Sequence, residues 1–322
     1  MTAKRTTLPL LLALSGLPAL APAQAVLWQN PEDIGSRNLV YGAGGKDHAP
    51  LGPVVFLKED LEGTNPKFDV RDQAGTKWKL KLGLEARPET AAYRIAWAVG
   101  YFTDEAYFIQ DLQIQGLPAH LHRGRNLVDA NGFVHNARLK RHPKDQEKEG
   151  GWKWRHDPFT GTRELNGLRV LMAVMDNWDL KDDNNKIYKD GSQEIYTVSD
   201  LGASFGWTGL RFPLSKCKGN LDNYTHSGFI RKSTQTVVDF ATPSRPTLIF
   251  LLGHPIDYFK RVHLEWIGRN IPRGDARWMG KLLASLSPTQ IQDAFRAAGY
   301  SPEEVNAFAA VVARRITMLT DL

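Results

Sequence analysis

The stretch NWDLKDDNNKIYKDGSQEIYTVSDLGASFG, from Asn177 to Gly206, gathers acids and asparagines between two apolar segments. Its first loop carries Asp179, Asp183 and Asn184, and Asp200 follows further along. Like charges brought within about 5 Å of each other repel by roughly 3 kcal/mol at an effective dielectric constant near 20. The clustering therefore predicts that a positive group lies among these carboxylates.

The middle of this stretch is typical of a β-hairpin. Lys186–Tyr188 and Ile195–Val198 are strand-like, and Asp190-Gly191 between them favours a tight turn. A hairpin returns the chain to its starting point. We therefore expect Asp200, just after the second strand, to come back beside Asn184.

The flanking segments predict a mostly helical C-terminal part. Upstream, apolar residues recur at helical spacing from Leu165 to Met175, so a helix delivers the chain to the polar loop. Downstream, Ser287–Gln290 and Ser301–Glu304 match the capping-box pattern that begins helices, and Gly299 stops the first of them. Two consecutive helices are expected at the C-terminus.

The N-terminal half predicts strands and one helix. Turn residues separate three strand-like runs, which are Val54–Leu57, Phe68–Val70 and Lys77–Leu82. The third run alternates strictly, with apolar residues on one face and lysines, among them Lys79 and Lys81, on the other. A helix follows, with Pro88 in its first turn and Gly100 at its end.

A run of mixed charge lies between Arg138 and Glu149 and is followed by Gly150-Gly151. This composition is typical of a solvated loop or linker. We therefore expect a boundary here between an N-terminal lobe, residues 26–141, and a C-terminal lobe, residues 142–322.

The parts occur in an order that resembles the protein-kinase fold. A strand lysine and a helix glutamate precede a polar loop with Asp179 and Asn184, five residues apart, and a hairpin leads from there to Asp200. The spacing is that of the catalytic-loop Asp and Asn of kinases. Asp200 takes the place of their metal-binding Asp.

Four segments carry a resemblance to atypical kinases. Gly63–Lys67 and Asn177–Asp179 resemble the Gly-x-x-Pro-Lys and Asn-x-Asp motifs of HipA-like kinases. Lys81–Gly83 with Glu89 is similar to the lysine, glycine and helix acid of phosphoinositide lipid kinases. Asp200–Gly206 resembles the Asp-x-Gly and Phe-Gly segment of secretory-pathway kinases, which phosphorylate exported proteins.

The resemblance implies an α+β, two-lobed fold with a small β-rich N-lobe containing one helix and a mostly helical C-lobe. It also implies transfer of the ATP γ-phosphoryl group to a hydroxyl of an unidentified protein or small molecule. Asp179 would be the base or positioning carboxylate, and Asn184 and Asp200 would bind Mg²⁺ or Mn²⁺. The phosphate contacts would come from Lys81, paired with Glu89, and from Gly63, Thr64 and Lys67.

Some positions depart from the kinase pattern or have rivals. No His-Arg pair precedes Asp179, the phosphate loop has a single glycine, and Leu201 stands in the middle of the Asp-x-Gly motif. Lys79 is an alternative to Lys81 as the phosphate-binding lysine, and Glu85 is an alternative to Glu89 as the acid that pairs with it.

Other functions remain open, namely an inactive pseudokinase, a nucleotidyl transferase, or a calcium-stabilised extracytoplasmic binding module. The calcium loop would not be an EF-hand, whose glycine and glutamate positions are unmatched.

The first residues predict export. Lys4 and Arg5 precede an apolar run from Leu8 to Leu20 and the small-x-small site Ala23–Ala25, so residues 1–25 are interpreted as a signal peptide. We expect a periplasmic or extracellular protein with no stable membrane insertion after cleavage, since the later apolar run Thr247–Leu252 is only strand-sized.

Net charge and cysteine content limit the classes of partner and the means of stabilisation. The formal charge of +6 is spread along the chain rather than gathered into a basic stripe, which argues against nucleic acid. Cys217 is the single cysteine, so no intramolecular disulfide can form. Stability must therefore come from a packed core.

Overall fold

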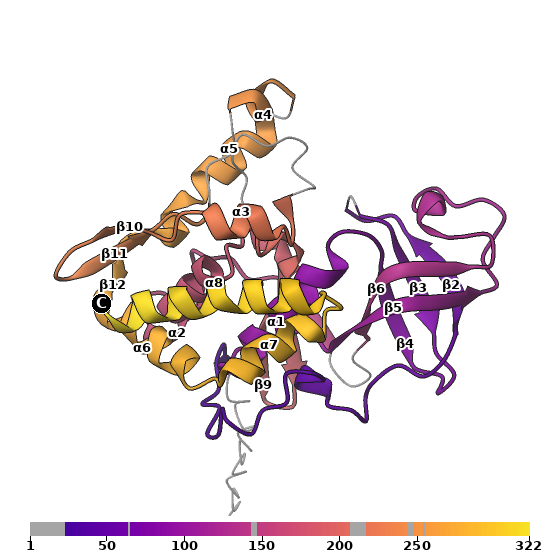
Figure 1. The fold of residues 1–322 in the computed structure, drawn as a ribbon, viewed down its shortest axis with the longest axis horizontal. Helices are drawn as coiled ribbons and strands as arrows, with labels where there is room; N and C mark the ends of the chain where they lie inside the picture. The colour runs from indigo at the N-terminus through magenta and orange to yellow at the C-terminus, as the bar shows by residue number, and fades with distance from the viewer. Residues whose placement is uncertain (1–22, 64, 143–146, 207–216, 244–247, 254) are drawn as a thin grey trace, which may run out of the picture.

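The computed structural model describes residues 23–63, 65–142, 147–206, 217–243, 248–253 and 255–322. Most of the predicted signal peptide and Thr64 lie outside these residues. The described chain forms an α+β structure with a β-rich N-terminal lobe and a larger, mostly helical C-terminal lobe (Figure 1). The predicted fold class is therefore confirmed.

Five strands of the N-terminal lobe close into a barrel in the order β2-β3-β4-β6-β5. The strands are β2 Val54–Asp60, β3 Lys67–Arg71, β4 Lys77–Lys81, β5 Ala106–Gln115 and β6 Phe133–Arg141. The parallel pairing of β2 with β5 closes the ring, and the other neighbours are antiparallel. Apolar side chains such as Phe68, Trp78 and Leu139 fill its interior. The three predicted strands are confirmed as β2, β3 and β4.

Helix α1 (Ala86–Ala98) links the two lobes. Pro88 stands in its first turn, as predicted, and Glu89 follows in the same turn. Ala92 and Ile95 on its apolar face belong to the core of the C-terminal lobe, together with Leu168 of α2. The helix is thereby held against the large lobe while its first turn reaches β4.

The C-terminal lobe is built on helices. They are α2 Arg163–Val174, α3 Leu221–His226, α4 Leu248–Gly253, α5 Pro255–His263, α6 Arg273–Ala284, α7 Pro288–Arg296 and α8 Pro302–Thr320. Both predicted capping boxes are present, at Ser287 and Ser301. Short 3₁₀ turns are η1 Gly42–Gly44, η2 Arg125–Leu127, η3 Asp182–Asn184, η4 Leu201–Ala203 and η6 Glu265–Gly268.

Two small sheets complete the C-terminal lobe. The first has the order β1-β9-β8-β7, with β1 Gln24–Val26, β7 Glu147–Gly150, β8 Asn185–Asp190 and β9 Gln193–Val198. The second has the order β10-β11-β12, with β10 Ile230–Ser233, β11 Val237–Phe240 and β12 Ile271–Pro272. The predicted hairpin is β8-β9. Because β1 pairs with β9, the first described residues pack with the large lobe.

One local expectation is wrong. The mixed-charge run was expected to be a solvated loop, yet β6 continues through Arg138 to Arg141 and β7 begins at Glu147. The run pairs with β4 and β8, and long-range contacts offset the poor strand composition. The strand-sized run Thr247–Leu252 contains the start of helix α4. No helix in the described parts of the chain combines the length and the apolar character that a membrane crossing requires.

Candidate active site between the two lobes

Lys81 ends β4 where the barrel meets the large lobe. Strand alternation places Lys77, Lys79 and Lys81 on one face, but their surroundings differ along the strand. Lys77 is exposed and Lys79 pairs with Asp60 and Asp69 on the barrel. The side chain of Lys81 is only 5% exposed. It is therefore Lys81, and not Lys79, that faces the interface between the lobes.

The Lys81 ammonium lies among three carboxylates. Its Nζ is 2.9 Å from Glu89 Oε2, 3.0 Å from Glu85 Oε2 and 2.6 Å from Asp200 Oδ1. Oxygens of these three acids lie within 4.8 Å of one another, so their mutual repulsion requires a cation. For Asp200, the positive group that the sequence predicts is this lysine. Glu85 and Glu89, the two candidate partners of the lysine, both contact it.

The charges in this cluster hold each other in the ionised state. Burial alone would lower the pKa of Lys81, but Glu89, Asp200 and Glu85 together raise it. Burial alone would raise the pKa of Asp200, and the Lys81 charge instead holds it well below its usual range. The pKa of Glu85 is likewise lowered, because Lys81 and Lys218 outweigh its burial. Lys81, Asp200 and Glu85 are therefore ionised at neutral pH.

A second group of residues, which sequence reasoning missed, positions Glu89. Arg138 of β6 donates to Glu89 Oε2 through Nε at 3.2 Å and through Nη2 at 3.0 Å. The Tyr93 hydroxyl lies 2.9 Å from Glu89 Oε1 and accepts a hydrogen bond from the Asp200 backbone amide at 3.0 Å. Because β6, α1 and the Asp200 turn meet at Glu89, its carboxylate has one orientation. Arg138 was hidden in the run interpreted as a loop.

Asp200 adopts a strained backbone conformation next to this cluster. Its φ and ψ are 54° and 49°, in the left-handed region that non-glycine residues rarely occupy. Its side chain is 48% exposed, whereas that of Glu89 is 1% exposed. Among the three carboxylates around Lys81, Asp200 is therefore the one that a bound cation can reach.

Asp179 and Asn184 lie on the other side of Asp200. The Asn184 side chain donates to the Asp179 carbonyl at 2.7 Å, and the Asp179 amide donates to Asn177 Oδ1 at 3.0 Å. These contacts close the loop into a compact turn. Asp179, Asn184 and Asp200 line the same small cavity, whose volume of about 10 Å³ is near that of one water.

The remaining loop acids point elsewhere, and one nearby cation was missed. Asp182 Oδ1 accepts a hydrogen bond from the Trp154 amide at 3.0 Å, which ties the loop to the chain before α2. Lys181 Nζ lies 3.3 Å from Asp179 Oδ1, and Lys181 lines the same cavity as Asp179. Its position two residues after Asp179 was the available signal. Within the acidic stretch, Asp179 therefore belongs to the candidate site, whereas Asp182 has a structural role.

Lys67 and Gly63 lie beside the cluster without joining it. In the ladder between β3 and β4, Lys67 is paired with Lys81, and the Pro66 carbonyl accepts a hydrogen bond from the Leu82 amide at 3.1 Å. The Lys67 ammonium lies 3.7 Å from Asp60, and the Gly63 carbonyl accepts a hydrogen bond from Arg123. Thr64, between them, lies outside the described residues.

Comparisons with known proteins bear on the fold. No family model matches the chain, and no curated protein sequence does. The Helicobacter pylori proinflammatory kinase CtkA matches in structure with a TM-score of 0.46 and 9% identity, over 84% of this chain and 98% of that chain. The Golgi casein kinase matches with a TM-score of 0.39 and 10% identity, over 85% of this chain and 73% of that chain. The same kinase with Mn/ADP bound matches with a TM-score of 0.39 and 8% identity, over 85% and 72%.

The chain is thus similar in structure to these solved kinases at low identity. What the interface between the lobes can do chemically follows from its own residues.

A divalent metal fits the accessible part of this interface. Lys81 already occupies the space between Glu85, Glu89 and Asp200, so this trio is a lysine site rather than a metal site. The cavity shared by Asn184 and Asp200 offers carboxylate and amide oxygens, the hard ligands that Mg²⁺ and Mn²⁺ prefer. The donor set therefore suits the predicted metal.

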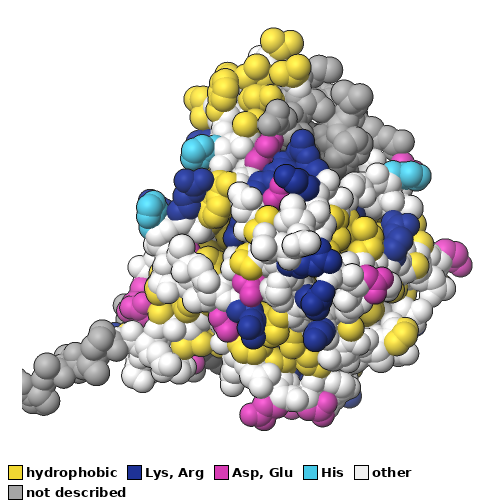
Figure 2. Space-filling model, turned by 90° about the vertical axis from the view of Figure 1, so that its left-hand side faces the viewer, with side chains coloured by type: hydrophobic (Ala, Val, Ile, Leu, Met, Phe, Trp, Pro, Cys, Tyr) yellow, Lys and Arg dark blue, Asp and Glu magenta, His cyan; other side chains and the backbone are white. Residues whose placement is uncertain are grey.

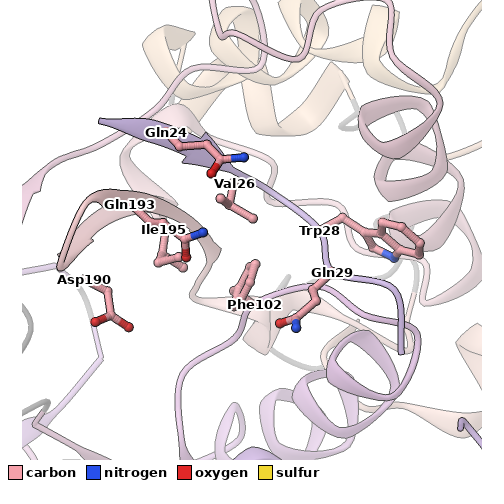
Figure 3. Close-up of a pocket in the computed structure, with 8 residues that line it drawn as sticks. All are labelled: Gln24, Val26, Trp28, Gln29, Phe102, Asp190, Gln193 and Ile195. Atoms are coloured by element: carbon pink, nitrogen blue, oxygen red, sulfur yellow. The ribbon is translucent and has the colours of Figure 1, made fainter. Parts of the chain in front are cut away.

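A larger pocket of about 360 Å³ lies at the other end of β9. Figure 3 shows its lining, with Gln24 of β1, Gln193 of β9 and Asp190 at the end of β8 on one side and Phe102 beside Gln29 on the other. The Trp28 indole at its edge donates to the Val99 carbonyl at 2.7 Å. None of the predicted site residues lines this pocket, so it is separate from the Lys81 cluster.

Proposed function

We propose that this protein is a phosphotransferase that moves the γ-phosphoryl group of ATP to a hydroxyl of a protein or small molecule. One observation carries the proposal. Lys81 contacts Glu89 and Asp200 at the same time, and Asp200 shares a cavity with Asp179 and Asn184. A phosphate-binding cation, a metal-binding acid and a carboxylate for the attacking hydroxyl are the groups that phosphoryl transfer requires.

Lys81 binds the phosphates in this proposal. Its ammonium is a compact charge that Glu89 orients, and Arg138 and Tyr93 in turn hold Glu89 in place. Because these partners are buried, the charge is already in position before a nucleotide arrives. Residues 63–67, beside Lys81 in the barrel, would cover the phosphates through Gly63, Thr64 and Lys67.

Asn184 and Asp200 hold the metal, either Mg²⁺ or Mn²⁺. When bound, the metal neutralises charge on the phosphate oxygens. The left-handed backbone of Asp200 turns its carboxylate away from the strand, so that it reaches both Lys81 and the shared cavity. The nucleotide phosphates and the metal would therefore meet at this residue.

Asp179 orients the acceptor. Its carboxylate accepts or directs the proton of the attacking hydroxyl, a role that contributes about 10²- to 10⁴-fold to the rate in enzymes. Lys181, 3.3 Å away, offsets the negative charge that gathers on the transferred group.

The predicted signal peptide supports an activity outside the cytoplasm. Residues 1–25 carry the basic start, apolar run and small-residue site of an exported protein. The reaction there requires a nucleotide supply in the periplasm or outside the cell. Nucleotide and acceptor are the partners that we propose.

A turnover assay tests this function. With labelled ATP and Mn²⁺, phosphate released to water and label incorporated into the chain or added proteins are measured for the wild type, Asp179→Ala and Asp190→Ala. We expect Asp179→Ala to lower the rate by about 10²-fold or more. Asp190, an exposed acid in the hairpin turn, is the matched control and should leave the rate unchanged.

Two outcomes would contradict the proposal. Equal rates in the wild type and Asp179→Ala would remove the assigned role of this carboxylate. Nucleotide binding without any transfer, in a folded protein, would make the chain a binding module rather than an enzyme.

A further inference from the structure

Helices α4 and α5 form a projection from the large lobe that is apolar on its outside. In Figure 1 both stand away from the other helices, and Figure 2 shows hydrophobic side chains gathered over the same end of the molecule. The exposed fractions are 72% for Leu248, 86% for Leu252, 72% for Ile256 and 62% for Phe259. These four residues are named the apolar tip.

The outer face of α5 changes from apolar to basic along its length. Ile256, Phe259, Lys260 and His263 recur at the i, i+3, i+4 and i+7 spacing of one helix face, and all four are exposed. Tyr258, on another face, is buried. The apolar tip is therefore followed by a cation on the side nearer to the body of the protein.

More cations lie where the projection joins the lobe. After α5 the chain passes through Leu264 into η6, and a hollow of about 540 Å³ there is lined by Arg231, Lys232 and Arg269. Two acids share the hollow, since Glu265 pairs with Arg269 at 3.9 Å and Asp239 accepts a hydrogen bond from the Asn270 amide. Arg231 and Lys232 are both exposed.

Large apolar side chains so exposed on a convex projection indicate a contact surface. An amphipathic helix with an apolar end and adjacent cations has the character of a segment that lies in a membrane interface. Its cations attract the anionic headgroups while its apolar side chains enter the boundary between headgroups and acyl chains.

We propose that the α4–α5 projection docks this protein on an anionic membrane surface. The apolar tip enters the interface, and Lys260, Arg231 and Lys232 contact the lipid headgroups. This is attachment to one surface and not a crossing of the bilayer. It rests on residues outside the Lys81 cluster, so it stands independently of the phosphotransferase activity.

Vesicle sedimentation tests the docking. The chain without residues 1–25 is mixed with phosphatidylcholine vesicles that either contain or lack phosphatidylglycerol, because the apolar leader would itself bind lipid. We expect binding to the anionic vesicles only, weakened about tenfold or more by the double substitution Leu252→Glu with Phe259→Glu. Leu61→Glu is the control, since Leu61 is 54% exposed on the barrel.

A separate variant tests how much positive charge contributes to vesicle binding. Lys260→Glu should weaken vesicle binding more than fivefold, because each cation near an anionic surface contributes about a fivefold gain and this change adds a repulsive charge. Raising the salt concentration should reduce the binding of the wild type in the same direction.

A labelled cysteine gives a readout that does not depend on the glutamate variants. Cys217 is the single native cysteine and is buried, so an environment-sensitive dye attached at Leu252→Cys reports on the apolar tip alone. We expect its emission to shift to the blue when anionic vesicles are added. The same dye at Leu61→Cys should not respond.

Several outcomes would overturn the proposal. They are no sedimentation of the wild type with anionic vesicles, unchanged sedimentation of the Leu252→Glu and Phe259→Glu variant, or no response of the dye at position 252. Self-association that the same double substitution abolishes, without vesicle binding, would assign the apolar tip to a second copy of the chain.

Discussion

Among the residues that the structure describes, Lys81 is the cation that touches Glu85, Glu89 and Asp200 together, and replacing it with methionine removes that charge. Methionine keeps the length and apolar character of the lysine stem, so packing changes little. Glu85 and Glu89 are buried, and they would be left as neighbouring anions with reduced compensation. Breaking a buried pair by removing one partner costs about 3–5 kcal/mol. Asp200 is half exposed, so solvent screens its share and it adds little to this figure.

The pH dependence of this cost has a definite sign. In the wild type the pKa of Lys81 is raised, so its contribution to stability is complete at neutral pH and is lost only as the pH rises through its folded value. The pKa values of Asp200 and Glu85 are lowered, so their contribution exists above about pH 4 and fades as the pH falls. The difference in unfolding free energy between the wild type and Lys81→Met should therefore be largest near neutral pH and shrink in acid.

Urea denaturation from about pH 2 to pH 8 measures this difference, since the carboxylate contribution fades only below about pH 4. Lys79→Met is the matched control, because Lys79 lies on the same strand and also pairs with two carboxylates, Asp60 and Asp69. Its side chain is 21% exposed, and we expect a cost of about 1 kcal/mol. A cost below 1 kcal/mol for Lys81→Met at pH 7, or equal costs for the two lysines, would refute the electrostatic reasoning.

Three further substitutions test the surroundings of the site, each by urea denaturation. Gly202→Ala should cost about 1–3 kcal/mol, because a Cβ there would lie 2.8 Å from Glu85 Cβ; a neutral result would show that η4 is not held against α1. Lys218→Gln should destabilise from neutral pH down to about pH 4 and lose this effect only below it, since Lys218 helps to lower the pKa of Glu85 and its contribution fades as the pH falls through that lowered value; a cost that stays constant well below pH 4 would contradict this. Arg315→Met should cost about 2–4 kcal/mol, because Arg315 is the buried donor to the Ala173 and Val174 carbonyls at the end of α2; an unchanged midpoint would contradict it.

Local signals predicted much of the C-terminal lobe. The capping boxes at Ser287 and Ser301 satisfy backbone groups within a few residues, so the pattern alone indicates where α7 and α8 begin. The turn at Gly191 and Ser192, one residue later than the predicted Asp190-Gly191, likewise determines the β8-β9 hairpin through contacts between neighbouring residues. Such elements need no information from the rest of the chain.

The choice between Lys79 and Lys81 could not be made from the strand pattern. Both lysines lie on the same face of β4, and what separates them is the cover that α1 and the Asp200 turn place over the end of the strand. That cover comes from segments distant in the sequence. A single sequence shows which residues share a face of the strand, but it does not show how deeply each side chain is buried.

Arg138 was missed for a related reason. Its run has the composition of a solvated loop, and its burial depends on Glu89, 49 residues earlier in the chain. A long-range ion pair turns a residue that is usually exposed into part of the interior. Local composition therefore does not predict the burial of polar side chains that form such long-range pairs.

Calorimetric titration of ATP in the presence of Mn²⁺ tests whether the Lys81 and Asp200 cluster binds a nucleotide. The wild type is compared with Asp200→Ala and with the exposed control Asp190→Ala, each also titrated without metal. We expect metal-dependent binding in the wild type and the control and none in Asp200→Ala. Equal binding by Asp200→Ala, or no binding by any of the three folded proteins, would contradict the assignment of the Lys81 and Asp200 cluster as a nucleotide site.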